Sequence, residues 1–408
     1  MQEIIVERPY RFVPPHRGDW LPCLMQRFRV VDRYLRKYEG IHSYEVRGID
    51  YLKESLRQKA GIILAPNHCR YADPLAMCWV LRPVDISPYA MASWHLFQRP
   101  LQTLAIRLCG GFSVNREGVD RQALETAISA IAEGKRPLIL FPEGTVFRSN
   151  DVLQPLLDGI AFIARSAAKR RAKLNKSPAV ILPVAIKYLF RGDVIRSITP
   201  IVEEYEHRFS WHLPIRRQKS MLERVRHLCH AYLATKELEH LGEVGQGPFA
   251  DRRDFLIETL LGQVESAWSI VEVPDRAIIP RIKALRLKMV PELLDAATVP
   301  ARKEQIRHDL NCIYVAQQVS SYPENYLDEP VTNTRLLETV EQLDEDIRDH
   351  ARIHRPLHAI LQIGAPLQVD EAKPPRNTTD PLLAELDARL RQMLEQLSQE
   401  AELLSSNT

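Results

Sequence analysis

Residues 61–74 read GIILAPNHCRYADP, and this stretch passes from an apolar run into a group of polar side chains. The run Gly61–Pro66 has the length of a short strand and is apolar throughout, which is typical of a strand inside a sheet that is covered on both faces. A helix is expected over Pro74–Leu81, because proline is favoured in the first helical turn. The stretch therefore predicts a strand, a polar turn that contains His68 and Asp73, and a helix.

The same alternation of short apolar runs and helical patterns continues from Gly40 to about Ile201. Further strands are expected at 84–91, 111–114, 137–141 and 179–188, and further helices at 100–108, 119–132 and 159–173. Strands that alternate with helices usually form a parallel sheet with helices on both faces. We therefore predict an α/β fold with a mostly parallel sheet covered by helices.

A different pattern follows this strand-rich part of the chain. Helix-period apolar spacing, with few strand signals, recurs in the segments 217–240, 250–271, 275–296, 300–319 and 333–350. After it, Leu357–Val369 alternates like a strand, and Asp380 can cap a helix that begins at Pro381. We predict an N-terminal segment 1–39, an α/β domain 40–204, a helical insertion domain 205–355, and a strand and helix in 356–408 that return to the α/β domain.

Residues 20–38 of the N-terminal segment have the spacing of a basic amphipathic helix. Its apolar positions are Leu21, Leu24, Met25, Phe28, Val31 and Leu35, and its basic positions are Arg27, Arg29, Arg33, Arg36 and Lys37. Such a helix can lie in a membrane interface with its apolar face towards the lipid. It can equally pack on its own domain, and the pattern alone leaves both placements open.

The composition of the 408 residues excludes several classes of protein. Hydrophobic residues are 45% of the chain and charged residues 26%, so the chain is neither wholly disordered nor a fibrous repeat. A net charge of +3 gives no reason to expect nucleic acid as the main partner. The six cysteines form no Cys-x-x-Cys pair and no cluster with histidines at zinc-ligand spacing, which indicates reduced thiols in a cytoplasmic chain without a structural metal. We expect neither a signal peptide nor a membrane-spanning helix, which would need about 20 apolar residues.

His68 and Asp73 are the first candidates for chemistry. A histidine just after a strand of a parallel sheet lies at the edge where such folds place their sites. Asp73 is five residues further on, and the turn can bring its carboxylate to one nitrogen of the imidazole. The other nitrogen is then free to take a proton from a hydroxyl group. Taken alone, the pair can also be explained structurally, with Asp73 as a helix cap and His68 as an ordinary loop residue.

Two further loops follow predicted strands. The first is Phe141–Arg148, FPEGTVFR, where Gly144 permits a close approach to a ligand and Arg148 offers a planar fork for a phosphate. The second is Gly110–Glu117, GGFSVNRE, where Arg116 could hold a phosphate with two hydrogen bonds. Each loop alone could be a solvated turn. Because the carboxyl ends of parallel strands gather at one edge of the sheet, the three loops together predict a single site.

These blocks resemble the phospholipid and glycerol acyltransferase family, typified by bacterial lysophosphatidic acid acyltransferases. The family's first block, a histidine and an aspartate separated by four residues, is similar to NHCRYAD at 67–73. Its second and third blocks are similar to GGFSVNR at 110–116 and FPEGTVFR at 141–148, and its fourth, an apolar strand with proline, to ILPVAI at 181–186. The resemblance covers roughly residues 40–200.

The resemblance implies transfer of a fatty acyl group from acyl-CoA or acyl carrier protein to a lysophospholipid hydroxyl, most simply that of 1-acylglycerol 3-phosphate. His68 would be the general base and Asp73 would orient it. The expected substrate-binding residues are Arg116, Glu143, Gly144, Thr145 and Arg148. No metal and no cofactor is implied, because a thioester is already activated. The expected location is the inner face of the membrane, as a peripheral protein.

This sequence departs from the family at Ala92–Phe97, where many members carry a lysine and this chain has Ser93 and His95. The acceptor could therefore be another molecule, such as glycerol 3-phosphate or a hydroxylated lipid. A protein that binds lipid surfaces without catalysis is a further alternative. A basic cluster could attract anionic headgroups or the phosphates of coenzyme A, or could be a solvated helix end; its members are Arg165, Lys169, Arg170, Arg171, Lys173 and Lys176.

Overall fold

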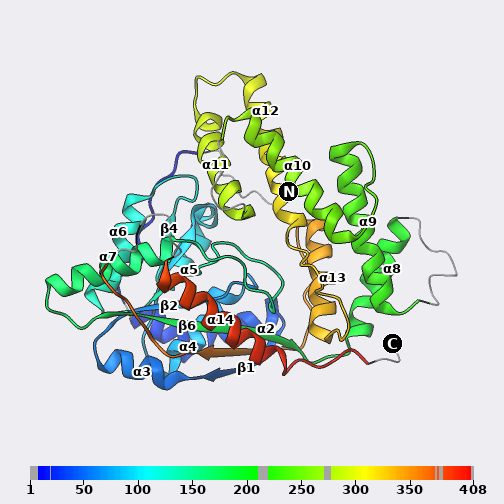
Figure 1. Cartoon of the computed structure of the whole chain (residues 1–408). Helices are drawn as coiled ribbons and strands as arrows, with labels where there is room; N and C mark the ends of the chain where they lie inside the picture. Colours follow the sequence, from blue (N-terminus) through cyan, green and yellow to red (C-terminus); the bar gives the residue numbers. More distant parts are fainter. Residues whose placement is uncertain are drawn as a thin grey trace. The chain divides into compact units, whose positions relative to one another are not determined.

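The computed structural model describes residues 8–18, 20–209, 219–270, 277–372, 375 and 380–405 (Figure 1). The contacts within the chain divide it into two units. The α/β unit consists of Tyr10–Arg191 and Ile353–Glu400. The helical unit consists of Gly192–Arg352 together with the segments at the two chain ends.

The α/β unit is built on one sheet with the strand order β1-β7-β6-β2-β5-β3-β4, and β8 pairs with β6. The strands are β1 (Ile41–Arg47), β2 (Gly61–Pro66), β3 (Tyr89–Ser93), β4 (Gly111–Val114), β5 (Leu138–Ile139), β6 (Ala179–Phe190), β7 (Leu357–Ile363) and β8 (Leu367–Gln368). The five strands from β6 to β4 run parallel, whereas β7 is antiparallel to β6 and β1 is parallel to β7. The predicted mostly parallel α/β fold is therefore confirmed.

Helices cover this sheet and complete its core. They are α1 (Trp20–Arg27), α2 (Val30–Tyr38), α3 (Ile49–Arg57), α4 (Asp73–Leu81), α5 (Pro100–Leu108), α6 (Arg121–Glu133), α7 (Gly159–Lys173) and α14 (Pro381–Ser398), with short 3-10 turns η1 (Arg82–Val84) and η2 (Trp94–Phe97). α6 and α7 pack on each other and on β2, and α14 packs on β6 and α7 (Figure 1). All residues of β2 and β6 are buried, as expected for central strands covered on both faces.

The returning C-terminal helix follows its sequence signals closely. Asp380 accepts a hydrogen bond from the backbone N–H of Leu382 at 2.9 Å, and Pro381 is the first helical residue, so the predicted cap is confirmed. Asp380 also pairs with Arg165 at 2.6 Å, which fixes the start of α14 against α7. The buried stripe of α14 contains Leu382, Leu386, Leu390, Met393, Leu394 and Leu397.

The helix expected at 20–38 is interrupted. Arg29 has a φ of 53°, in the left-handed region, and separates α1 from α2. The buried face of α2 contains Val31 and Leu35, and Asp32 forms an ion pair with Arg82 at 2.5 Å. The helix therefore packs on its own unit, yet Leu24, Phe28, Val30, Tyr34 and Tyr38 remain exposed on its other side. The side chains of Leu21 and Met25 lie outside the described residues.

The helical unit contains α8 (Val194–Arg208), α9 (Met221–Leu241), α10 (Phe249–Ala267), α11 (Ile278–Leu294), α12 (Pro300–Val319) and α13 (Asn333–Arg348). These helices lie in sequence between β6 and β7, which are neighbours in the sheet. The expected domain boundary at residue 204/205 falls inside α8 and is wrong. α8 packs on α9 and α13, and its buried Tyr205 donates a hydrogen bond to Asp344 at 2.5 Å, so the division lies at Gly192.

The other expected domain boundaries also differ from those of the structure. The chain re-enters the α/β unit at Ile353, and residues from Ala401 onwards group with the helical unit. Tyr10 and the residues that follow it, including α1 and α2, belong to the α/β unit rather than to a separate N-terminal segment. The reason is packing: α2 contacts β1 and α4.

The basic cluster at 165–176 is not one exposed patch. Arg171 is buried and donates to the carbonyl oxygens of Ile131, Ala132, Lys59 and Ser177, and Arg165 is held by Asp380. A separate ion pair joins Arg170 to Glu125 at 2.7 Å. Only Lys169, Lys173 and Lys176 of the cluster are exposed. The three arginines of the cluster therefore stabilise the α/β unit, and the three lysines are exposed at its surface.

Among the described residues, no helix is long and apolar enough to cross a membrane. The five cysteines whose side chains are described, Cys69, Cys78, Cys109, Cys229 and Cys312, are free thiols.

Candidate active site

The imidazole of His68 and the carboxylate of Asp73 lie together in the turn between β2 and α4. His68 Nδ1 is 2.9 Å from Asp73 Oδ2. A carboxylate accepts hydrogen bonds, so Nδ1 carries the proton and Nε2 is left as an acceptor. The His68 side chain is 14% exposed and the Asp73 side chain is fully buried. The imidazole is therefore partly exposed, whereas the carboxylate that holds it is closed off from solvent.

Asp73 is held by more than His68. Its Oδ2 also accepts the backbone N–H groups of Cys69 and Arg70, each at 2.8 Å, and its Oδ1 accepts the hydroxyl of Tyr188 at 2.8 Å. Burial and the charge of Asp73 raise the pKa of Tyr188 well above its ordinary value, so this hydroxyl remains a donor. Four nitrogen and oxygen donors around one carboxylate fix its position and compensate for its burial.

The alternative explanation of Asp73 as a helix cap is wrong. The residue at the cap position of α4 is Ala72, and no side chain caps the helix. Asp73 is the first residue of α4, and its carboxylate turns back to the N–H groups of the preceding turn. The carboxylate therefore shapes the loop that carries His68 rather than the helix that follows.

Two neighbours orient the His68 loop. The ring of Phe141 stacks on the imidazole, with centroids 4.0 Å apart and an angle of 25° between the planes. Asn67 pairs with the backbone of Ile186 in β6, donating to its carbonyl at 3.0 Å and accepting its N–H at 2.7 Å. The stacking restricts the imidazole, and the hydrogen bonds of Asn67 attach the end of β2 to β6.

The loop after β5 is attached directly to the His68 loop. Glu143 Oε1 accepts the backbone N–H of His68 at 2.6 Å, and its Oε2 accepts the N–H of Gln154 at 2.8 Å. The N–H of Phe147 donates to the carbonyl of His68 at 3.1 Å. Two of these hydrogen bonds join the His68 loop to the loop after β5, and the third lies within the loop after β5, so the two loops hold one geometry.

Glu143 was expected to bind substrate, and in the structure its side chain faces backbone N–H groups of the two loops. It is 2% exposed, and both of its oxygens accept backbone N–H groups. Burial raises its pKa from the ordinary 4.5 to about 8. Its hydrogen bonds connect the two loops, and its expected part in substrate binding stays a prediction.

The other residues of this loop are half-buried: Gly144, Thr145 and Arg148. Gly144 has a φ of +71°, and a Cβ there would also approach Leu157 at 2.4 Å, so the turn requires glycine. The guanidinium of Arg148 lies over the ring of Tyr71, 5.8 Å from its centroid. Because Tyr71 belongs to the turn after His68, Arg148 and the imidazole lie on neighbouring loops.

Arg116 follows β4 in a half-buried turn. β4 is three strands from β2 in the sheet, which corresponds to about 14 Å at the usual strand spacing. Both strands are parallel and end at the same edge, so the turns of His68 and Arg116 share that edge. The sheet therefore brings His68, Asp73 and Arg148 together and places the turn of Arg116 further along.

Sequence reasoning missed Tyr188, Asn67 and a buried ion pair between Lys187 and Asp151. Lys187 is fully buried in β6, and Ser398 of α14 donates to Asp151 at 2.7 Å. This group attaches the end of the β5 loop to β6 and α14. A lysine inside an otherwise apolar strand was the one available signal, because a buried ammonium group needs an acidic partner.

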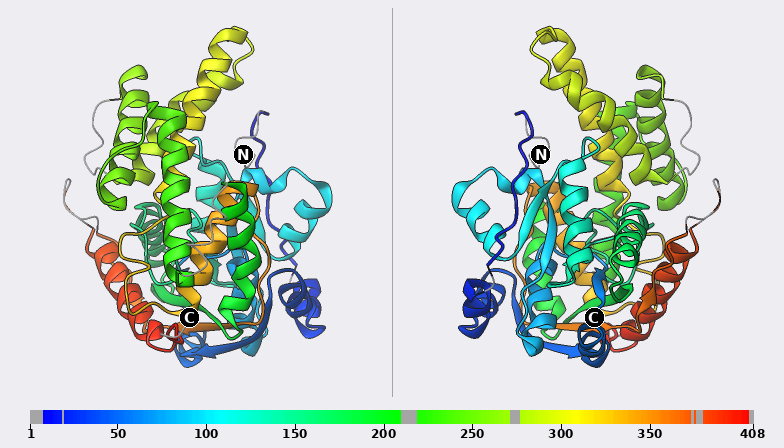
Figure 2. Two further views of the ribbon diagram at one scale, coloured as in Figure 1. Left: turned by 90° about the vertical axis from the view of Figure 1, so that its right-hand side faces the viewer. Right: turned by 90° about the vertical axis from the view of Figure 1, so that its left-hand side faces the viewer.

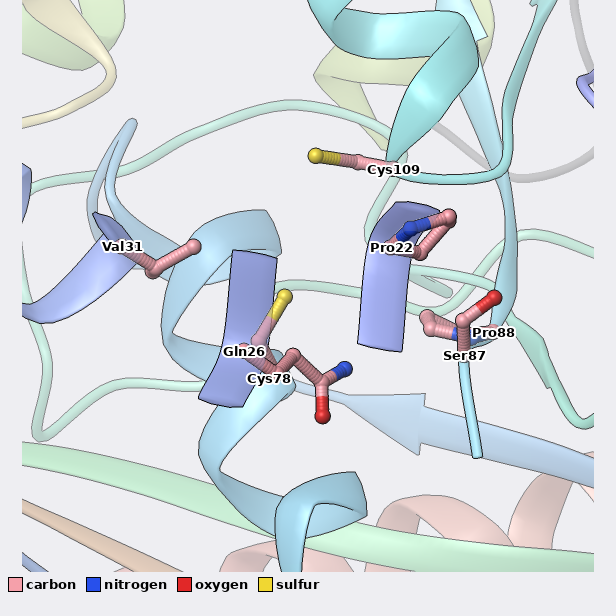
Figure 3. A pocket seen from close by; sticks show the side chains of 7 residues that line it. All are labelled: Pro22, Gln26, Val31, Cys78, Ser87, Pro88 and Cys109. Carbon is pink, nitrogen blue, oxygen red and sulfur yellow. The ribbon is translucent and has the colours of Figure 1, made fainter. Parts of the chain in front are cut away.

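The described part of the chain holds no metal cluster, and one of its pockets lies away from the His68 loop. No group of three or more histidine, cysteine or acidic side chains there could hold a metal ion. One pocket, shown in Figure 3, has about 280 Å³ of empty space that is partly open to solvent; it is lined by Pro22, Gln26, Val31, Cys78, Ser87, Pro88 and Cys109. Burial raises the pKa of the Cys78 thiol to about 12 and also raises the pKa of the Cys109 thiol, so both thiols stay protonated near neutral pH.

The chain is similar to a family model and to a bacterial protein. Residues 44–187 match the family model described as Acyltransferase. Over 113 residues it is 33% identical to a protein of Streptococcus pneumoniae (strain ATCC BAA-255 / R6) named 1-acyl-sn-glycerol-3-phosphate acyltransferase. The alignment covers 28% of this chain and 40% of that relative, so the chain spans less than half the length of the relative.

Proposed function

We propose that the protein transfers a fatty acyl group from a thioester to the free hydroxyl of a lysophospholipid, with 1-acylglycerol 3-phosphate as the acceptor. The observation that carries this proposal is the His68–Asp73 pair, in which the buried carboxylate holds Nδ1 at 2.9 Å and the His68 side chain is 14% exposed. The acyltransferase domain and the printed name of the relative support the same reaction class.

In the proposed reaction, His68 Nε2 takes the proton of the acceptor hydroxyl as its oxygen attacks the thioester carbonyl carbon. The new C–O bond forms a tetrahedral intermediate, and the C–S bond then breaks. The imidazolium returns its proton to the departing thiolate, so the products are an ester and a thiol. Asp73 stabilises the imidazolium while it exists, because its carboxylate accepts the Nδ1 proton throughout.

The two arginines are proposed to bind the phosphate of the acceptor. Arg148 lies on the loop that is bonded to the His68 loop, and Arg116 lies on a turn at the same edge of the sheet. Guanidinium groups bind phosphate through two parallel hydrogen bonds, which fixes both the position and the orientation of the ligand. Thr145, one residue beyond the glycine turn, is proposed to contact the glycerol part.

We also propose that the protein works at a membrane surface, because its acceptor is a lipid. Supporting this, the side of α1 and α2 that does not pack on the α/β unit exposes Leu24, Phe28 and Val30. Arg27, Arg29 and Arg33 are exposed around them. Exposed apolar side chains among cations suit an interface that contains anionic lipids.

The experiment that tests the proposal is an acyl-transfer assay with the full chain. Acyl-CoA and acyl carrier protein thioesters are each offered with 1-acylglycerol 3-phosphate, glycerol 3-phosphate or a monoacylglycerol as acceptor. We expect phosphatidate as the main product, and the better thioester identifies the donor. A higher kcat/KM with glycerol 3-phosphate or with the uncharged monoacylglycerol would reject the proposed acceptor, and absence of transfer to every acceptor would reject the reaction.

A further inference from the structure

The first described segment of the α/β unit lies beside the edge strand β4. The N–H of Ser113 donates to the carbonyl of Val13 at 3.0 Å, and the N–H of Val13 donates to Ser113 Oγ at 2.7 Å. Figure 2 shows this dark blue segment running beside the cyan part of the sheet. The contact covers the outer edge of β4, next to the turn that carries Arg116.

Tyr10 is at the start of this segment, and its side chain extends beyond β4 to Asp120, the cap residue of α6. Its hydroxyl donates to Asp120 Oδ2 at 2.5 Å and lies 3.1 Å from Ser113 Oγ. Its ring meets Trp94 edge to face, with centroids 5.3 Å apart. Burial and the neighbouring Asp120 carboxylate raise the pKa of Tyr10, so the hydroxyl keeps its proton near neutral pH.

Asp120 in turn fixes the turn after β4. Its Oδ2 accepts the N–H of Asn115 at 3.0 Å, and its Oδ1 caps α6 through the N–H of Ala123 at 3.0 Å. Asn115 Oδ1 accepts the N–H of Glu117 at 3.1 Å. Both residues beside Arg116 therefore have their backbone held, and Asp120, which is 9% exposed, is common to the cap and the turn.

We propose that Tyr10 is a positioning residue for the acceptor, acting through Asp120 on the turn that carries Arg116. This inference rests on the proposed function, because it assigns Arg116 to the phosphate of the acceptor. A hydrogen bond from a hydroxyl to a partly buried carboxylate is among the stronger ones, and a less well-held Arg116 would bind the phosphate of the acceptor more weakly. Tyr10 does not touch the reacting atoms.

The test is Tyr10→Phe in the full chain, which removes one oxygen atom and keeps the ring against Trp94. We expect KM for 1-acylglycerol 3-phosphate to rise about tenfold, with kcat and the KM of the thioester within about twofold of the wild-type values. Tyr51→Phe is the matched control: Tyr51 is exposed on α3, and its variant should behave as wild type. An unchanged acceptor KM, or an equal rise of both KM values, would overturn the proposal.

A second variant and a second measurement separate this inference from the proposed function. In an Arg116→Lys background, Tyr10→Phe should raise the acceptor KM by less than twofold, because the guanidinium that it positions is already gone; a full tenfold rise there would contradict the proposal. Hydrogen exchange of residues 113–120 needs no activity and should be faster in Tyr10→Phe and in Asp120→Asn. If the wild-type chain transfers no acyl group, the proposed function fails, and unchanged exchange in 113–120 would overturn the positioning role independently.

Discussion

Tyr188 of β6 donates a hydrogen bond to Asp73 Oδ1 at 2.8 Å, and both side chains are fully buried. The two residues are 115 positions apart and meet because β6 pairs in parallel with β2, which ends just before His68. The carboxylate that orients His68 is thus held by the local turn on one oxygen and by the neighbouring strand on the other. The geometry of the candidate base depends on the sheet, and not on its own loop alone.

The contact predicts the effect of Tyr188→Phe. The variant leaves Asp73 Oδ1 without its hydroxyl donor, so the free energy of unfolding should fall by about 1–3 kcal/mol. Turnover should fall about three- to tenfold, because the carboxylate can move while Nδ1 keeps its acceptor. Urea unfolding and the transfer assay measure the two effects. Wild-type values in both would show that the hydrogen bond has no role in holding Asp73.

Glu143 predicts a pH dependence of stability. Its pKa is raised in the folded chain from 4.5 to about 8, so between these values the folded state binds more protons than the unfolded state. The stability contributed by protonated Glu143 is complete below about pH 4.5 and is lost as pH rises towards about 8. Glu143→Gln cannot titrate. The free energy of unfolding of wild type relative to Glu143→Gln should therefore fall with rising pH, by at most about 1.4 kcal/mol per pH unit.

Urea unfolding of both proteins at pH 5, 6, 7 and 8 checks this expectation. Taking the difference between the two chains cancels the titration of other buried groups, such as Asp346 in the helical unit, whose pKa burial raises to about 7. A difference that stays constant over this range would mean that Glu143 does not change its protonation there.

The ion pair of Lys187 and Asp151 predicts strong coupling. Both side chains are buried, so removing one charge leaves the other without its main partner. Lys187→Met and Asp151→Leu should each lower the free energy of unfolding by about 3–5 kcal/mol, whereas the double variant should lose less than the sum. A double-mutant cycle in urea measures the coupling. Additive losses would mean that the coupling free energy between the two charges is small.

The exposed apolar side chains of the N-terminal helices predict binding to lipid vesicles. Phe28, which is 60% exposed between α1 and α2, should insert into the interface, so Phe28→Asp should weaken binding to anionic vesicles about tenfold or more. Phe255→Asp is the control, because Phe255 is 64% exposed on α10 of the helical unit. Cosedimentation with vesicles measures both. Equal behaviour of the two variants would exclude a specific role for the N-terminal helices.

The sequence predicted the bounds of helices and strands well where the apolar pattern agrees with the residues that favour their ends. The strands at 61–66 and 111–114 and the helices at 100–108, 159–173 and 300–319 have the expected bounds. It did not predict the break at Arg29, because the apolar spacing continues through the residue that adopts the left-handed conformation. It also placed the domain boundary inside α8, since the helical pattern does not indicate that Tyr205 packs towards Asp344.

For the site, the sequence predicted that His68 and Asp73 lie together, but not which residues hold them. The spacing of His68 and Asp73 is local, so a turn can be inferred from it. Tyr188 and Asn67 act across strands, and their contacts depend on the register of β2 with β6, which residue patterns do not encode. The role of Glu143 was missed for a similar reason: whether a carboxylate faces a ligand or the backbone of a neighbouring loop depends on tertiary packing.

The central claim is that His68 is the general base of acyl transfer. The most direct measurement compares turnover of thioester and 1-acylglycerol 3-phosphate by wild type, His68→Ala and His42→Ala, where His42 is an exposed histidine of β1 in the same unit. We predict that His68→Ala loses about 10²–10⁴ in kcat while His42→Ala keeps wild-type turnover. Wild-type turnover by a folded His68→Ala protein would contradict the account.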